Sequence, residues 1–171
     1  MYSDSTFDAI LSSVRDKLLR SIDELAPETC VITINPDAAA LPVSQELYCT
    51  VSPTSGSFDE PLFDGGGREQ TTLEGGIVVK CFSMLQLDQP NQDSVMLIDR
   101  SRGVLRKLHE ILAALAGYMP ASEDSQKTLT RNPLIPATYA FSHDGRRWGA
   151  VEVVFRLSFD WDLSASPGAI V

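Results

Sequence analysis

The segment from Val151 to Asp162 alternates hydrophobic and polar residues, and this alternation restricts the fold more than any other feature of the chain. One side carries Val151, Val153, Phe155, Leu157, Phe159 and Trp161, and the other carries Glu152, Val154, Arg156, Ser158, Asp160 and Asp162. Successive side chains of a strand point to opposite faces of its sheet, so the pattern predicts a long strand with one buried and one largely wet face.

A hairpin is predicted in front of this strand. Asp144-Gly145 is a favourable two-residue turn, and Tyr139 and Phe141 precede it with the same spacing of two. The segment from Pro120 to Pro136 contains three prolines and reads as a polar linker.

Two amphipathic helices are predicted from apolar residues that recur three or four positions apart. The first has Ser5 or Thr6 as its cap and Pro27 just after its end. Its stripe consists of Phe7, Ile10, Leu11, Val14, Leu18, Ile22 and Leu25. The second has Asp99 or Ser101 as its cap and Gly117 near its end. Its stripe consists of Val104, Leu105, Leu108, Ile111, Leu112 and Leu115.

Three further strands are predicted over Thr29–Pro36, Glu46–Pro53 and Gly76–Asp88. The last has β-prone residues on both faces, which is typical of a central strand covered on both sides. Residues 54–76 are rich in Ser, Gly, Asp and Glu, and predict a long mobile loop or a projecting hairpin arm. Their glycines do not form a phosphate-binding loop, because no Lys-Ser/Thr pair follows and the next element is a strand rather than a helix.

The 171 residues, 43% of them hydrophobic, suit a single domain with its own core. The ordered part is expected over about 5–163, with the flexible arm at about 54–76 and a loose C-terminal tail at 164–171.

The formal charge of −9 argues against certain partners. A surplus of carboxylates repels nucleic-acid phosphates and anionic lipid, so neither sequence-specific nucleic-acid binding nor membrane binding is expected. The first twenty residues lack the pattern of a signal peptide, and no later run is long and apolar enough to cross a bilayer. A soluble, unexported protein is expected.

No constellation of residues predicts catalysis, a metal or a cofactor. Cys30, Cys49 and Cys81 are far apart in sequence and read as reduced, half-buried thiols, and neither His109 nor His143 is near a cysteine. A weak enzyme alternative rests on acidic pairs such as Asp160 with Asp162 at a strand end, which are more often simply solvated.

A locally basic cluster precedes and enters the second helix. It consists of Arg100, Arg102, Arg106 and Lys107. The simpler interpretation is the solvated face of an amphipathic helix, and the alternative is a patch that pairs with an acidic neighbour in an oligomer.

The order of these elements resembles the tail-terminator and related tail-completion proteins of long-tailed bacteriophages, from about Phe7 to Asp162. The resemblance lies in the first helix, the strand pair, the long polar arm, the strand "GIVVKCFSMLQLD", the helix "GVLRKLHEILAAL" and the closing hairpin that ends in "VEVVFRLSFDWD". It implies an α+β domain with two helices packed on a mainly antiparallel sheet and a long loop or hairpin arm.

The resemblance also implies a function without catalytic residues. Such proteins form a ring, commonly a hexamer, that ends the tail tube and contacts tail-tube and head-completion proteins, first in the host cytoplasm and then in the virion tail. The acidic charge would keep passing DNA from adhering to the ring. The oligomer or partner contacts that it implies are Phe58, Leu62, Phe63, Arg68, Asp88, Asp93, Arg100, Arg102 and Arg106. The alternative function is a small soluble binding or adaptor module of a phage-derived secretion or injection system.

Overall fold

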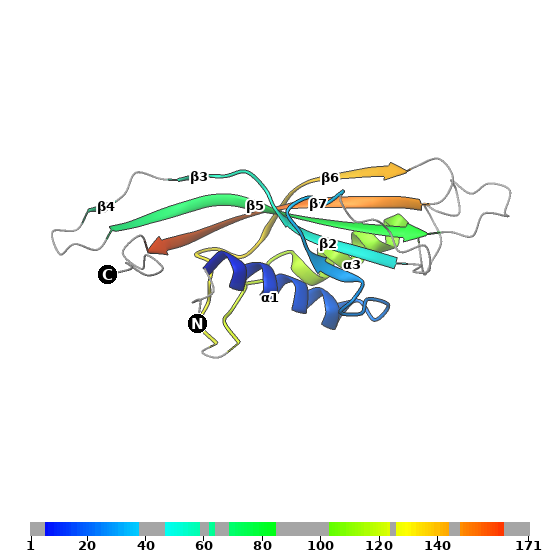
Figure 1. Ribbon diagram of the computed structural model, residues 1–171, viewed down its shortest axis with the longest axis horizontal. Helices are drawn as coiled ribbons and strands as arrows, with labels where there is room; N and C mark the ends of the chain where they lie inside the picture. Colours follow the sequence, from blue (N-terminus) through cyan, green and yellow to red (C-terminus); the bar gives the residue numbers. More distant parts are fainter. Residues whose placement is uncertain are drawn as a thin grey trace, which may run out of the picture.

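In the part of the chain that the structure describes, two helices pack on one face of a mainly antiparallel sheet (Figure 1), which confirms the predicted α+β class. The computed structural model describes residues 6–37, 47–58, 62–63, 69–84, 103–123, 126–143 and 148–162. The helices among these residues are α1 (Thr6–Ser21) and α3 (Val104–Leu115). The strands are β1 (Cys30–Ile32), β2 (Leu47–Pro53), β3 (Ser57–Phe58), β4 (Leu62–Phe63), β5 (Glu69–Met84), β6 (Ile135–His143) and β7 (Trp148–Asp162).

Within the described residues, these strands form one sheet in the order β1-β2-β5-β7-β6, and β3 and β4 also pair with β5. Among the described strand pairs, β1 with β2 is parallel and the others are antiparallel. The two long strands, β5 and β7, pair from Gln70 opposite Asp162 to Met84 opposite Trp148. They run the length of the molecule, and one end projects past both helices as a narrow arm (Figure 1).

The alternation predicted for the last strand is confirmed over its described side chains. Val151, Val153, Phe155, Leu157 and Phe159 are buried on the face that carries the helices, whereas Arg156 and Asp160 are exposed on the other. The predicted cover on both faces of the central strand is also confirmed, because Val78, Lys80 and Phe82 are buried as well as Ile77, Val79 and Cys81. The hydrophobic core lies between the sheet and the helices.

The predicted start of this central strand at Gly76 is wrong, because β5 begins at Glu69. Residues 69–76 therefore belong to the sheet and not to a loop. The polar composition of the segment hid the strand. Its first residues pair in the projecting arm, and Leu73 is the residue of 72–74 whose side chain reaches the core. The predicted end at Asp88 lies outside the described residues.

Two glycines, Gly56 and Gly76, allow two segments to cross closely where the arm meets the body of the sheet. Pro53 pairs with Ile77 and Ser57 pairs with Glu74, so one side advances from 53 to 57 while the other advances only from 77 to 74. This extra residue is a β-bulge. A Cβ at Gly56 would collide with the carbonyl oxygen of Glu74, and one at Gly76 would lie 2.6 Å from Oγ1 of Thr54. Gly56 and Gly76 thus permit close contact between the two segments.

The apolar stripe of the first helix faces the core as predicted, although the helix ends earlier than expected. Ile10, Val14 and Leu18 are buried in α1, which stops at Ser21, and Leu25 is buried after it in a turn. The start of α1 reaches the arm end of the core, where the rings of Phe7 and Phe159 are 5.4 Å apart.

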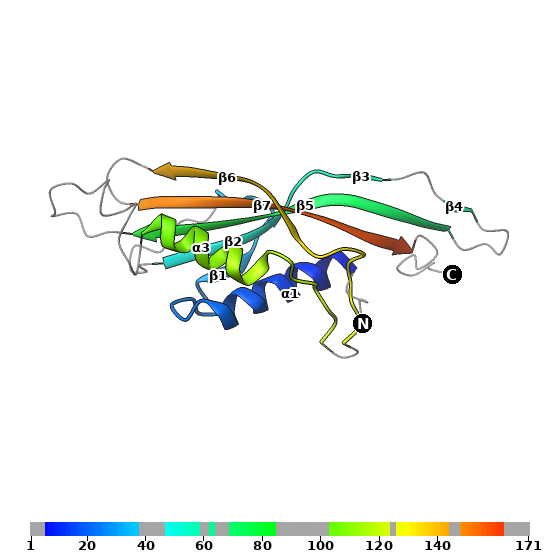
Figure 2. The same ribbon diagram turned by 180° about the vertical axis from the view of Figure 1, so that it is seen from behind.

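The second helix lies beside the first (Figure 2) and begins at Val104, with Gly103 as its cap. The predicted cap at Asp99 or Ser101 is therefore wrong. Because Gly103 has no side chain, no side-chain oxygen bonds to the first turn. Asp99 and Ser101 themselves lie outside the described residues.

The segment predicted as a linker over 120–136 is tied to the core. Leu134 is buried, and it both accepts a hydrogen bond from the amide of Gly117 at 2.9 Å and donates one to the carbonyl of Tyr118 at 2.8 Å. The amide of Arg131 donates to the carbonyl of Ser158 on β7 at 2.8 Å. These bonds position the start of β6. The predicted hairpin is confirmed by antiparallel pairing of β6 with β7, while its turn at Asp144-Gly145 and the tail at 164–171 lie outside the described residues.

Candidate interaction surfaces

The strand β6 forms the outer edge of the sheet and is exposed. His143 is its one basic residue. β6 pairs only with β7 among the described strands, so no described strand lies along its other edge. Its sequence, IPATYAFSH, contains no Lys, Arg, Asp or Glu. Unpaired N–H and C=O groups along such an edge can accept another strand, and proteins ordinarily protect an edge of this kind with charge, proline or a bulge.

The side chains of β6 add hydrophobic surface to this edge. Ile135 is 54% exposed, Tyr139 63% and Phe141 42%. Tyr139 pairs with Val153 and Phe141 with Val151, so both rings lie on the same face of the sheet as the core. The two rings contact each other edge-on, with centroids 5.6 Å apart. Only the first end of β6 carries protection, from Pro136 and a bulge before Thr138.

The opposite edge of the sheet has two parts, β1 along the body and β3 with β4 along the arm. Among the described residues, they differ in whether their outward backbone groups are already bonded. At β1, the outward groups of Cys30 are both bonded: its amide donates to the carbonyl of Ala26 at 3.0 Å, and its carbonyl accepts Nε of Arg15 at 2.7 Å. At β3, which pairs only with β5 in the described part of the sheet, Phe58 is 65% exposed. The β1 edge is therefore closed at Cys30, and the arm edge is exposed at Phe58.

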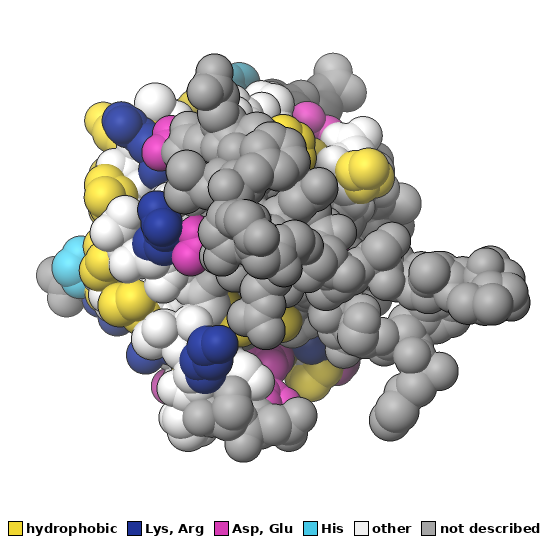
Figure 3. Space-filling view, turned by 90° about the vertical axis from the view of Figure 1, so that its left-hand side faces the viewer, with side chains coloured by type: hydrophobic (Ala, Val, Ile, Leu, Met, Phe, Trp, Pro, Cys, Tyr) yellow, Lys and Arg dark blue, Asp and Glu magenta, His cyan; other side chains and the backbone are white. Residues whose placement is uncertain are grey.

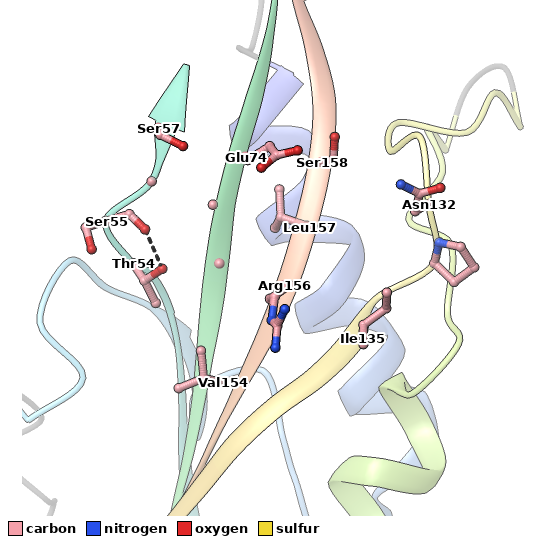
Figure 4. A pocket seen from close by; sticks show the side chains of 14 residues that line it. Thr54, Ser55, Ser57, Glu74, Asn132, Ile135, Val154, Arg156, Leu157 and Ser158 are labelled. Carbon is pink, nitrogen blue, oxygen red and sulfur yellow. Dashed lines mark hydrogen bonds between the residues drawn. The ribbon is translucent and has the colours of Figure 1, made fainter. Parts of the chain in front are cut away.

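A shallow hollow of about 570 Å³ lies at the base of the arm (Figure 4). Its floor is formed by the glycine crossing on β5 and by β7, and its walls come from the segment before β3 and the segment before β6. Residues that line it include Thr54, Glu74, Asn132, Ile135, Arg156 and Ser158. Arg156 lies on the floor between Val154 and Leu157, on the side of Ile135. The hollow is open to solvent, and its lining combines a carboxylate, a guanidinium and several hydroxyl groups with apolar side chains.

In the basic cluster predicted as a solvated helix face, the prediction is wrong for Lys107, which is only 1% exposed. Arg100 and Arg102 lie outside the described residues. The Nζ of Lys107 lies 2.9 Å from Oε2 of Glu110 and 3.3 Å from Oε1 of Glu24. Arg106 is partly exposed and donates from Nε to Oε1 of Glu110 at 2.7 Å. Burial of the Glu110 carboxyl opposes its ionisation, but the hydrogen bonds from Lys107 and Arg106 outweigh this and hold its pKa below the ordinary value.

A second buried lysine lies on the face of the sheet opposite the helices. Lys80 forms ion pairs with Asp37 and with Glu152, the latter at 3.7 Å, and its Nζ lies 5.3 Å from the centre of the Phe82 ring. Both buried lysines are thus compensated by carboxylates, which is what the burial of a cation requires. They stabilise the fold and do not form a basic surface.

Three cysteines that are distant in sequence lie side by side on adjacent strands. Cys30 pairs with Cys49, and Cys49 pairs with Cys81, in the register of β1, β2 and β5. All three are free and fully buried, which corrects the expectation of half-buried thiols. Hydrogen bonds with Cys30 and Cys81, together with burial, hold the pKa of Cys49 well above its ordinary value. A raised pKa makes this thiol a poor nucleophile at neutral pH.

The predicted contact residues fall into three groups. Phe58 is exposed on β3, and Arg106 is partly exposed on α3, where its charge is engaged by Glu110. Leu62 and Phe63 form β4 and pair with Gln70 and Glu69, so their backbone lies on the arm edge near Phe58. Arg68, Asp88, Asp93, Arg100 and Arg102 lie outside the described residues.

Sequence reasoning missed β6 as a surface, although Tyr139 and Phe141 were placed in a hairpin. The available signal was the absence of charge over Ile135–His143 in a chain of net charge −9. Figure 3 shows the molecule from the end that carries the arm. The described Lys and Arg side chains on this face are separated by acidic and hydrophobic ones, so they form no continuous basic patch there.

In the part of the chain that the structure describes, no group of three His, Cys, Asp or Glu residues is placed to hold a metal ion. None of the described helices is long and apolar enough to span a membrane. A scan of the chain against models of known protein families gives no match, and a search of curated proteins gives none either.

Proposed function

We propose that the protein is a structural, non-enzymatic tail-completion protein of a long-tailed phage or a prophage-like particle. Its copies assemble into a ring, with a hexamer favoured, that ends the tail tube and joins it to the head-proximal connector. Its partners are then further copies of itself, tail-tube protein and head-completion proteins, and it passes from the host cytoplasm into the virion tail.

The observation that carries the proposal is the uncharged, aromatic edge strand β6 on a protein of net charge −9. A monomer that remained alone would be protected from edge-to-edge association by charges on such a strand. An assembly subunit needs surfaces of this kind, because a ring closes through repeated contacts between two different patches of the same chain. The α+β fold with a projecting arm is the one that the resemblance implies.

The assembly state of the purified full-length protein tests the proposal. Light scattering from micromolar to millimolar concentration, followed by electron microscopy of the heaviest fraction, should give rings of a single size. Where the protein alone stays small, addition of purified tail-tube protein should produce rings at tube ends and tubes of limited length. Monomers at every concentration, together with tubes whose length and ends are unaffected, would overturn the proposal.

The second candidate, an adaptor module of a phage-derived secretion or injection system, is favoured by the hollow at the base of the arm. Arg156 and Glu74 place opposite charges there beside hydroxyl groups, and neither forms an ion pair with a described residue. An adaptor would form a stable one-to-one complex with a different protein and would not self-assemble. The same scattering experiment separates the two functions.

A further inference from the structure

We infer that two copies of the free protein pair through their β6 strands, which lie antiparallel about a two-fold axis between the two Ala140 residues. The inference goes beyond the proposed function, because it concerns the free protein before any assembly and can hold or fail independently of the ring. The occupant of the β6 edge is thus a second copy of the same strand. Because a two-fold pair closes on itself, it protects this edge in the free protein.

The position and charge of β6 allow a second copy to approach it. The strand lies along the outer margin of the sheet, and no other described strand lies beyond it (Figures 1 and 2). Two copies that each carry a net charge of −9 repel each other over most of their surfaces, whereas β6 contains no Lys, Arg, Asp or Glu. The carboxylate opposite Ala140 on β7, that of Glu152, is already paired with Lys80. The β6 edge is therefore a place where two acidic copies can meet.

The sequence of β6 favours a second copy over a different partner, because it reads nearly the same in both directions from Ala140. Aromatic residues, Tyr139 and Phe141, lie one position away on either side, and hydroxyl residues, Thr138 and Ser142, lie two positions away. In an antiparallel pair centred on Ala140, each Tyr139 lies opposite the second copy's Phe141, and each Thr138 lies opposite its Ser142. Like side chains thus meet like ones in every row.

The two faces of the pair also match. A two-fold axis perpendicular to the sheet makes the strands antiparallel, which is the more stable pairing, and keeps the helices of both copies on one face. Tyr139 and Phe141 pair with Val153 and Val151, which are buried on that face, so the four exposed rings of a dimer gather there. On the other face the small Ala140 side chains lie at the axis, where they do not hinder the approach of the two backbones.

The part of β6 that resists pairing falls outside the dimer contact. In this register His143 faces residue 137, and Pro136 would face residue 144, which lies past the end of the strand. Pro136 lacks an N–H, and the bulge lies between Pro136 and Thr138. Neither therefore removes a hydrogen bond from the paired segment Thr138–Ser142.

The mass of the full chain in solution tests the dimer. Light scattering below the concentrations that give rings should report twice the 18.7 kDa of one chain. Tyr139→Lys should raise the dimer dissociation constant at least about tenfold, because two aromatic pairs are lost per dimer and a charge enters each edge. Ile34→Lys is the matched control, since Ile34 is 88% exposed just after β1 on the opposite edge, and it should leave the constant unchanged. Circular dichroism and the thermal midpoint verify that both variants fold.

Disulfide cross-linking tests the register. Ala140→Cys places one thiol of each copy beside the axis, so mild oxidation should convert this variant into covalent dimers. Thr138→Cys and Ser142→Cys should each remain largely uncross-linked alone. An equimolar mixture of the two, combined before oxidation, should form covalent dimers of one copy of each, because these positions face each other. The three native cysteines are buried and should add little background.

The possible outcomes separate this inference from the proposed function. A wild-type protein that is monomeric up to millimolar concentration would overturn the inference, whereas rings at tube ends would still support the proposed function. Equal dimerisation of Tyr139→Lys and Ile34→Lys would place the contact on another surface. Cross-linking of Ser142→Cys with itself, and not with Thr138→Cys, would overturn the axis at Ala140. Ala140→Cys dimers from a protein that never forms rings would support the inference and refute the ring.

Discussion

Lys107 Nζ lies 2.9 Å from Oε2 of Glu110 while its own side chain is almost completely buried between the two helices and the sheet. Glu110 follows Lys107 by three residues on the same helix, α3. The Nζ of Lys107 also lies 3.3 Å from Oε1 of Glu24, which follows the end of α1. This ion pair therefore connects α3 to the segment that follows α1 through charge, in addition to the hydrophobic contact between the helices.

Removing this cation should destabilise the protein strongly. Lys107→Ala leaves the largely buried Glu110 carboxylate with Arg106 as its only described ion-pair partner and opens a gap beside α3. Breaking a buried ion pair typically costs about 3–5 kcal/mol, and the remaining Arg106 places the expected loss near the lower end. Urea unfolding followed by circular dichroism measures it. Glu24→Gln is the control, since Glu24 is half-exposed and should change stability by less than about 1 kcal/mol. A Lys107→Ala variant as stable as Glu24→Gln would contradict the argument.

Glu110 should make stability depend on acid pH. Burial opposes ionisation of its carboxyl, but the bonds from Lys107 and Arg106 prevail and hold its pKa below the ordinary value of 4.5. Because the folded pKa is the lower one, the contribution is fully present above the unfolded value and is lost as pH falls through the folded value. The difference in unfolding free energy between wild type and Glu110→Gln should therefore shrink as pH is lowered below about 4.5. Parallel pH profiles of the two proteins, measured by urea unfolding, would contradict this.

The glycine crossing should not tolerate a methyl group. In Gly76→Ala the new Cβ would lie 2.6 Å from Oγ1 of Thr54 and 3.0 Å from the carbonyl oxygen of Phe155, so the arm must shift relative to β7. Overpacking of this kind typically costs about 1–3 kcal/mol. Gly75→Ala is the matched neighbour, because its Cβ meets only the movable end of the Leu73 side chain at 3.2 Å and the Gly56 Cα at 3.7 Å. Denaturant midpoints compare the two, and equal losses would show that the crossing is not the constraint.

The three cysteines should be unreactive in the native protein. Their thiols are buried, and the raised pKa of Cys49 disfavours the thiolate. With a chromogenic disulfide reagent at pH 8, labelling should be slow in buffer and complete to three thiols in denaturant. Ser142→Cys provides the positive control, since residue 142 is exposed on β6 and its added thiol should react within the mixing phase. Rapid labelling of the wild type without denaturant would refute the buried arrangement.

The elements that the sequence predicted best are those whose burial follows a strict period. The alternation in β7 and the three-to-four spacing in α1 and α3 record which side of each element meets the core, so their existence and buried faces were readable directly. The start of β5 was not, because Glu69 to Glu74 is polar and becomes a strand only through its partners β3, β4 and β7. The helix cap at Gly103 was missed for a related reason, since no capping side chain marks it.

The contact surfaces were readable only in part. Phe58 was predicted on the arm and is exposed there, whereas Lys107 was assigned to a wet face and is buried. No local pattern separates a lysine that meets solvent from one that meets Glu110 and Glu24, because the second carboxylate comes from a distant segment.

The sequence by itself determined the α+β class, the two amphipathic helices and the long half-buried strand, because hydrophobic periodicity is a local property of the chain. Only the tertiary structure decided that Cys30, Cys49 and Cys81 align, that Gly56 and Gly76 permit a backbone crossing, and that β6 is left as an open edge. Each of these depends on which strand lies beside which, and strand neighbours are chosen by pairing between segments far apart in sequence.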